Sequence, residues 1–96
     1  MPLKESEIND ITREVATLTL PSNSFVKAIN SSTVSSTGDP ALRIVVFVTP
    51  ESTAAISGRD ALKTFTELQR RLQERNDDRF PIIEYATAKE AKLAGS

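Results

Sequence analysis

The stretch RIVVFVTPESTAAISGRDALKTF, residues 43–65, passes from an apolar run through a polar loop into an amphipathic segment. If the amphipathic segment is a helix, its N-terminus lies near the polar loop, and free N–H groups at a helix N-terminus attract anions. The residues around this helix start include Ser52, Thr53, Gly58 and Arg59. A phosphate loop needs several glycines and a following G-K-[ST], whereas this loop has one glycine and no such lysine. Ser57 followed by Asp60 predicts a capping box, so we interpret the junction as a capped helix start.

If the chain binds RNA, four basic residues of the amphipathic segment would make the contacts. They are Lys63, Arg70, Arg71 and Arg75. Glu67 and Glu74 lie among them at spacings of three and four, which predicts charge pairing on a solvated helix face. The net charge of the chain is −1, so no overall basic field favours phosphate binding. RNA binding is therefore the alternative function and not the leading one.

Residue types that usually carry catalysis or bind transition metals are missing, because the chain has no Cys and no His. Catalysis would depend on carboxylates, lysines, hydroxyls or Tyr85, and no nucleophile, base and orienting group can be assembled from them. Asp77 and Asp78 lack the spacing of a calcium loop, and we interpret them as a solvated turn after a helix. The sequence predicts no enzyme, no cofactor and no metal.

The elements that position these residues follow from hydrophobic periodicity. Ile8, Ile11, Val15 and Leu18 recur at spacings of three and four, which predicts a helix over about residues 3–18. A second such stripe, comprising Ala61, Phe65, Leu68 and Leu72, predicts a helix that starts after Ser57 and ends near Asn76.

Three strands are expected between and after these helices. The run 42–49 is apolar on both faces, as in a central strand that is covered on each side. A strand from Phe25 precedes it, and the Ser/Thr-rich residues 31–40 supply the turn. Residues 79–87 form the third strand. Thr87 and Glu90 predict a short C-terminal helix.

The resulting order is α-β-β-α-β in one α+β domain over residues 1–96. A strand-helix-strand unit makes a right-handed crossover, so the third strand should run parallel to the second or its neighbour. We expect a three-stranded mixed sheet with both long helices on one face.

This helix-strand-strand-helix-strand order resembles that of KH-type RNA-binding domains and of the ribosome-binding factor A group. The resemblance implies an RNA-binding or ribosome-associated role. The sequence lacks the G-x-x-G clamp of a KH domain, and its basic residues do not form a net positive face.

The second face of the predicted sheet indicates binding to a partner. If the helices cover the face that holds Ile44, then alternation turns Val45 and Phe47 to the other face. Strand one can add Phe25 or Val26 to this second face, and strand three can add Ile82 or Ile83. An exposed apolar patch marks an interaction surface. The candidate contact residues are Val45, Phe47, Phe25 and Ile83.

These observations favour a small cytoplasmic domain that acts by protein–protein contact, as an adaptor or a homodimer. The longest apolar run, Ile44–Val48, is far below the ~20 residues that span a bilayer. The N-terminal residues include early acidic side chains and no apolar signal region, so no membrane or secretory role is expected.

Overall fold

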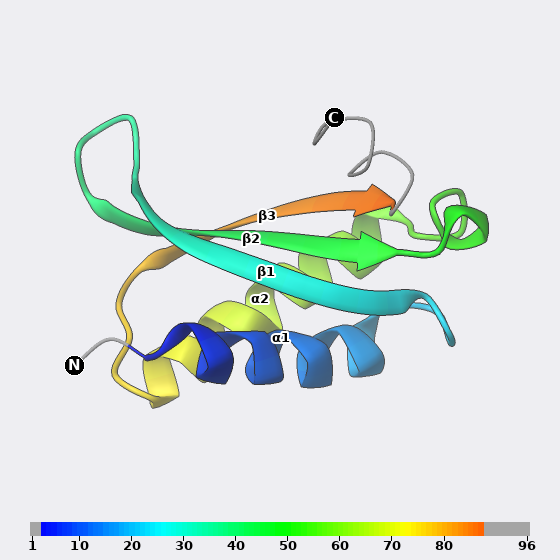
Figure 1. The fold of residues 1–96 in the computed structure, drawn as a ribbon, viewed down its shortest axis with the longest axis horizontal. Helices are drawn as coiled ribbons and strands as arrows, with labels where there is room; N and C mark the ends of the chain where they lie inside the picture. The colour runs from blue at the N-terminus through cyan, green and yellow to red at the C-terminus, as the bar shows by residue number, and fades with distance from the viewer. Residues whose placement is uncertain (1–2, 88–96) are drawn as a thin grey trace.

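Two helices and three strands make up residues 3–87, the part of the chain that the computed structural model describes (Figure 1). In chain order the elements are α1 (Glu5–Thr19), β1 (Phe25–Val34), β2 (Pro40–Val48), a 3₁₀ turn η1 (Pro50–Ser52), α2 (Gly58–Glu74) and β3 (Phe80–Thr87). This order confirms the predicted α+β fold. The C-terminal helix that was expected from Thr87 onward lies outside the described residues.

The sheet has the order β1-β2-β3, with β2 antiparallel to β1 and parallel to β3. The predicted mixed sheet and the parallel crossover through α2 are therefore confirmed. The Ser/Thr-rich arm differs from its prediction, because β1 continues to Val34 and only residues 35–39 turn. Gly38 has φ +86°, a left-handed conformation that glycine adopts without a steric penalty.

The first helix packs its stripe against the sheet as predicted, except at one residue. Ile8 and Val15 are fully buried, but Leu18 is 69% exposed. At 3.6 residues per turn, Leu18 lies about 80° around the helix from Ile8, so it points to the edge of the buried face. Each of the two helices in residues 3–87 falls short of the length and apolar character that a bilayer crossing needs.

The second helix begins and ends as its local sequence predicts. The Asp60 N–H donates to Ser57 Oγ at 3.1 Å, and the Ser57 N–H donates to Asp60 Oδ2 at 3.0 Å, which completes the capping box. Asn76 has φ 63° and closes the C-terminus, where the Asp77 N–H donates to the Leu72 carbonyl at 2.9 Å.

The core lies between the helices and the β2 side chains that alternate toward them. Those of Leu42, Ile44 and Val46 are 0% exposed, and they pack with Leu68 and Leu72 of α2. Burying an aliphatic side chain of this kind contributes about 1.5–3 kcal/mol relative to leaving it exposed, so this layer is the main source of stability.

The interpretation of Asp77 as part of a solvated turn is wrong, because Asp77 is only 2% exposed. Its carboxylate accepts the Leu3 N–H at 3.1 Å and the Arg79 Nε and Nη2 groups at 3.0 and 2.7 Å. Arg79 also donates to Ser32 Oγ at 2.8 Å and to the Leu3 carbonyl at 3.3 Å. This Asp77–Arg79 pair therefore ties the chain start, the hairpin and the α2–β3 loop together.

We expect Asp77→Asn to lower the free energy of unfolding by about 2 kcal/mol, because the amide cannot accept the same charge-assisted bonds from Arg79. Asp78→Asn is the matched control, since Asp78 is exposed and should change stability by less than about 0.5 kcal/mol. Urea unfolding at neutral pH measures both variants, and equal effects at the two positions would contradict the assignment.

The same pair makes a prediction about pH. Hydrogen bonding from the Arg79 side chain lowers the pKa of Asp77 from its ordinary value of 3.8, outweighing desolvation. A carboxylate with a lowered pKa contributes stability that is complete above its unfolded pKa and is lost as the pH falls toward its folded pKa. The stability difference between the parent and Asp77→Asn should therefore shrink below about pH 4. A difference that stays constant down to about pH 2 would contradict this.

Candidate protein-interaction surface

The junction between β2 and α2 forms a shallow hollow rather than a phosphate site. It has a volume of about 370 Å³ and lies beside Val48, Ile56, Gly58 and Tyr85. The Ser57–Asp60 capping box already uses two of the backbone N–H groups at this helix start. Its lining therefore offers an apolar wall and a capped helix, with no cluster of anion-binding donors.

Tyr85 is the one aromatic hydroxyl at this hollow, and it is not a candidate base. Its oxygen is buried and makes no hydrogen bond of ordinary length. Burial raises the pKa of Tyr85, which a weak interaction with the Thr64 hydroxyl only partly offsets. The phenol stays protonated at neutral pH. Thr64 itself donates to the Asp60 carbonyl and shares a hydrogen bond with Thr19. Its hydroxyl is therefore already engaged and does not activate a nucleophile.

Arg70 and Arg71 of α2 are paired with acidic residues of α1 and α2. Arg70 Nε donates to Glu67 at 3.1 Å and Arg70 also pairs with Glu74. Arg71 bridges Glu67 and Glu14, each at 3.1 Å, and thereby links α2 to α1. The hydrogen bonds from Arg70 and Arg71 lower the pKa of Glu67 to about 2. The interleaved spacing therefore forms the charge pairs that the sequence predicts.

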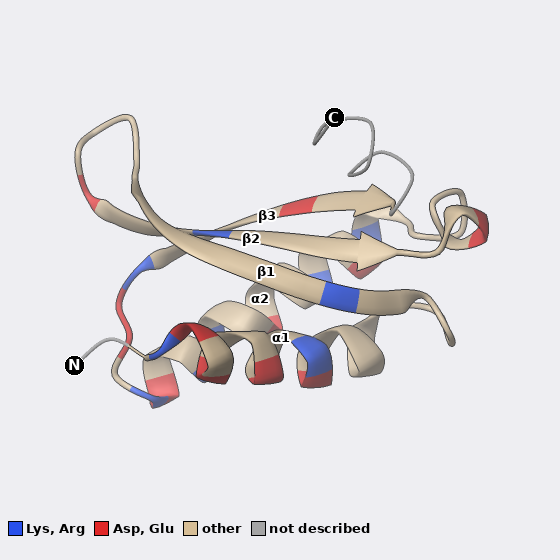
Figure 2. Cartoon of the chain, viewed as in Figure 1, with Lys and Arg blue, Asp and Glu red and all other residues tan. Residues whose placement is uncertain are grey.

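The two remaining basic residues of the RNA alternative add little positive charge. Arg75 lies 3.3 Å from a Glu7 carboxylate oxygen, and Lys63 is the one of the four candidate RNA contacts that has no ion-pair partner among residues 3–87. Figure 2 shows acidic and basic residues mixed along both helices, whereas the sheet carries few charges. The structure brings the four basic residues onto one helix without making a net basic surface.

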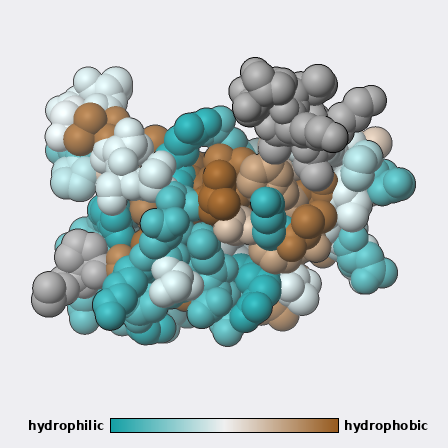
Figure 3. Space-filling model, in the orientation of Figure 1, coloured by the Kyte–Doolittle hydropathy of each residue, from teal (hydrophilic) through white to brown (hydrophobic). Residues whose placement is uncertain are grey.

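The second face of the sheet, here called the open face, is the side of the strands opposite α1 and α2. The strand registers place four rows of side chains on this side, and the row at the hairpin end, Thr33–Ala41–Phe80, reaches α2 because the Phe80 ring packs on Phe65. The other three rows are Lys27–Phe47–Ala86, Ile29–Val45–Glu84 and Ser31–Arg43–Ile82. Figure 3 shows hydrophobic side chains gathered over the strands and hydrophilic ones over α1. Val45 and Phe47 thus lie on the face on which the sequence places them.

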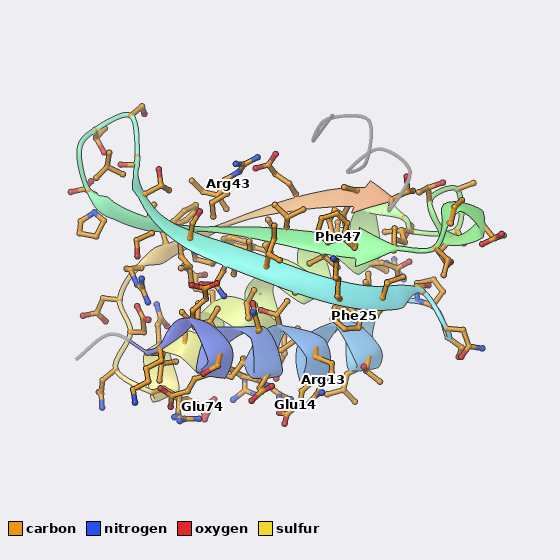
Figure 4. All side chains as sticks on the ribbon, viewed as in Figure 1. Arg13, Glu14, Phe25, Arg43, Phe47 and Glu74 are labelled. Atoms are coloured by element: carbon orange, nitrogen blue, oxygen red, sulfur yellow. The ribbon has the colours of Figure 1, made fainter. Side chains whose placement is uncertain are left out.

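Phe25 and Ile83 do not join Val45 and Phe47 on the open face, which corrects their assignment. A β-bulge between Phe25 and Lys27 shifts the alternation of β1, so that Phe25 pairs with Val48 and packs against the core (Figure 4). The parallel register pairs Ile83 with Ile44, which faces the helices. The neighbours that take their places are Ile29 and Ile82.

Among the apolar side chains of these three rows, the two isoleucines are the most exposed. Ile29 is 47% and Ile82 37% exposed, and Val45 is half-buried between them. Phe47 is only 6% exposed, with the Lys27 ammonium 5.2 Å from its ring centre. Arg43 and Glu84 form an ion pair in which the Arg43 hydrogen bond lowers the pKa of Glu84. The face is therefore an apolar band with a paired charge and one further cation.

Sequence reasoning missed Ile29 and Lys27 as members of this face, and it left Ile82 and Ile83 as alternatives. Strict alternation from Val45 identifies the partners of each row only when the register between strands is known. The hydrophobic pattern of 82–83 offers two adjacent isoleucines and cannot distinguish them. No local signal in FVKAI indicates the bulge that turns Phe25 inward.

No protein-family model, curated protein or solved structure matches the chain. Within residues 3–87, no group of three acidic side chains gathers as a metal-binding cluster. The chemistry of the described side chains is what indicates a function.

For the RNA alternative, we expect a structured RNA hairpin to show no tight binding at about 50 mM salt, because the arginines are neutralised within the chain. Glu67→Gln with Glu74→Gln frees these guanidinium groups and serves as a positive control, since it should give weak and salt-sensitive binding. Fluorescence anisotropy measures both. Tight binding by the parent that Arg70→Ala with Arg71→Ala abolishes would establish the alternative.

Phe47 and Ile29 should respond differently to truncation. Phe47→Ser should cost about 3 kcal/mol of unfolding free energy, because the buried ring leaves a cavity. Ile29→Ser should cost about 1 kcal/mol or less, because its side chain is already half in solvent. Urea midpoints of the two variants provide the comparison. Equal costs would mean that the two residues do not differ in burial in solution.

Proposed function

We propose that this chain is a non-catalytic, cytoplasmic protein-interaction module that binds its partner through the open face of the sheet. The proposal depends on one observation. Ile29 and Ile82 are exposed on either side of Val45, on the sheet face that neither α1 nor α2 covers. Apolar side chains gathered in this way favour burial against another molecule.

Covering this band contributes part of the free energy that recognition needs. Full burial of an aliphatic side chain contributes about 1.5–3 kcal/mol, and those of Ile29 and Ile82 are each about half available. Because the sheet backbone is already paired within the face, a partner meets side chains and few unsatisfied polar groups. The Arg43–Glu84 pair at the edge of the band can supply orientation, since rim charges set specificity more than affinity.

Two other functions have less support from the same contacts. Catalysis has less support because the pKa of Tyr85 is raised and Glu67 and Glu74 of α2 are held by arginines. RNA binding has less support because Arg70, Arg71 and Arg75, three of its four candidate contacts, are paired with acidic side chains. Sheet-mediated protein contact uses apolar side chains that are exposed and have no internal role among residues 3–87.

To test the proposal, Ile29→Ser is combined with Ile82→Ser as an open-face variant. Leu18→Ser with Leu62→Ser is the matched control, because these leucines are 69% and 65% exposed on the helices. Each protein is immobilised, proteins retained from cells that produce the chain are identified by mass spectrometry, and each is then purified for direct titration. We expect the open-face variant to bind at least about tenfold more weakly, as loss of two apolar contacts implies.

Either of two binding results would contradict the proposal. If a purified partner binds the parent and the open-face variant equally, or loses affinity only for the helix control, then the open face is not the contact surface. Sedimentation of the parent over a dilution series is measured alongside, so that self-association is distinguished from binding of a different protein.

A further inference from the structure

The dimensions of the open face restrict what can cover it. Three strands spaced about 4.8 Å apart make a face about 14 Å wide, and the three rows of side chains that do not reach α2, about 6.7 Å apart, extend about 20 Å along it. The area is therefore about 300 Å². A stable interface between two proteins buries about 800 Å² on each partner. Two copies of this chain packed through this face would fall well short of a stable dimer.

The backbone chemistry of an occupant is restricted as well. Covering an apolar face removes water from the occupant's own N–H and C=O groups, which must then be paired. The strands of the open face offer it no free backbone partners in the direction of their side chains. A helix satisfies its backbone internally, and its diameter of about 10 Å fits across the 14 Å face. About 13 residues of helix match a length of about 20 Å.

The charges on the face favour one sign of partner. Arg43 and Glu84 neutralise each other, and Lys27 forms no ion pair with a carboxylate in residues 3–87. Its ammonium lies over the Phe47 ring, at the border of the apolar band. An incoming carboxylate would meet this cation, whereas an incoming lysine would be repelled by it.

Resting on the interaction function proposed above, we propose that the occupant of the open face is a single amphipathic helix of another protein. The helix is three to four turns long, with an apolar stripe for Ile29, Val45 and Ile82 and an acidic side chain beside the stripe for Lys27. The small area makes the interaction weak and reversible. The chain itself stays monomeric at this face.

The probes are two synthetic 14-residue helices with the same leucine stripe, one flanked by glutamates and the other by lysines. Amide chemical shifts of the full chain report where each peptide binds, and fluorescence anisotropy reports affinity. We expect shifts at Ile29, Val45 and Ile82, and about fivefold tighter binding of the glutamate peptide, as for one exposed ion pair. Lys27→Glu should reverse this preference. Leu18→Asp with Leu62→Asp should leave both affinities unchanged.

Three outcomes would overturn the inference. They are shifts confined to the helices, equal binding of the two peptides that Lys27→Glu does not alter, and nuclear Overhauser contacts from residues beyond 87 to Phe47 that persist with peptide present. Concentration-dependent dimerisation that Ile29→Ser with Ile82→Ser abolishes would assign the face to a second copy instead. If purified partners still depend on the open face while neither peptide binds, the helix inference fails and the proposed interaction function stands.

Discussion

The packing of β2 between its neighbours is the constraint on which the rest of the structure depends. This strand is apolar on both faces, pairs on both edges, and contributes Leu42, Ile44 and Val46 to the core at 0% exposure. Both amphipathic helices bury their stripes against the same side of it, because the two chain segments that precede and follow the hairpin return there. One face is thereby closed, and the other is left to Val45 and Phe47.

Polar contacts join α1 to α2 on the side of the sheet that the helices cover. The same contacts engage charged side chains that could otherwise bind a ligand. Thr19 and Thr64 share a hydrogen bond between α1 and α2 at 2.6 Å, and Arg71 joins the same helices through Glu14. The arginine pairs of α2 contribute little individually, because their side chains are at least partly exposed. Their consequence for function is larger, since arginines that hold neighbouring carboxylates cannot also neutralise phosphates. The same interleaving of charges therefore serves the fold and weakens the RNA alternative.

The functional conclusion comes from side chains and not from the architecture, because one fold supports many unrelated functions. The order of elements resembles that of KH-type domains, yet the residues that would bind RNA there have no counterpart in this chain. The apolar open face is the feature of this sequence on which the proposed function rests. Its small area and the cation at Lys27 together favour a transient partner over a permanent one.

The sequence by itself determined the features that arise from local interactions. The stripes of α1 and α2, the Ser57–Asp60 cap, the Asn76 terminus and the two-sided strand β2 all follow from periodicity and backbone preference. The α-β-β-α-β order and the parallel crossover could be predicted from these elements with general connection rules.

Tertiary structure alone decided what depends on contacts between distant residues. The β1 bulge turned Phe25 inward, and the β2–β3 register chose Ile82 over Ile83 for the open face. Asp77 became buried because Arg79 and Leu3, near opposite ends of the described chain, meet at its carboxylate. Side-chain period along a strand is a local property, whereas register and burial are set by the packing of segments that the sequence separates widely.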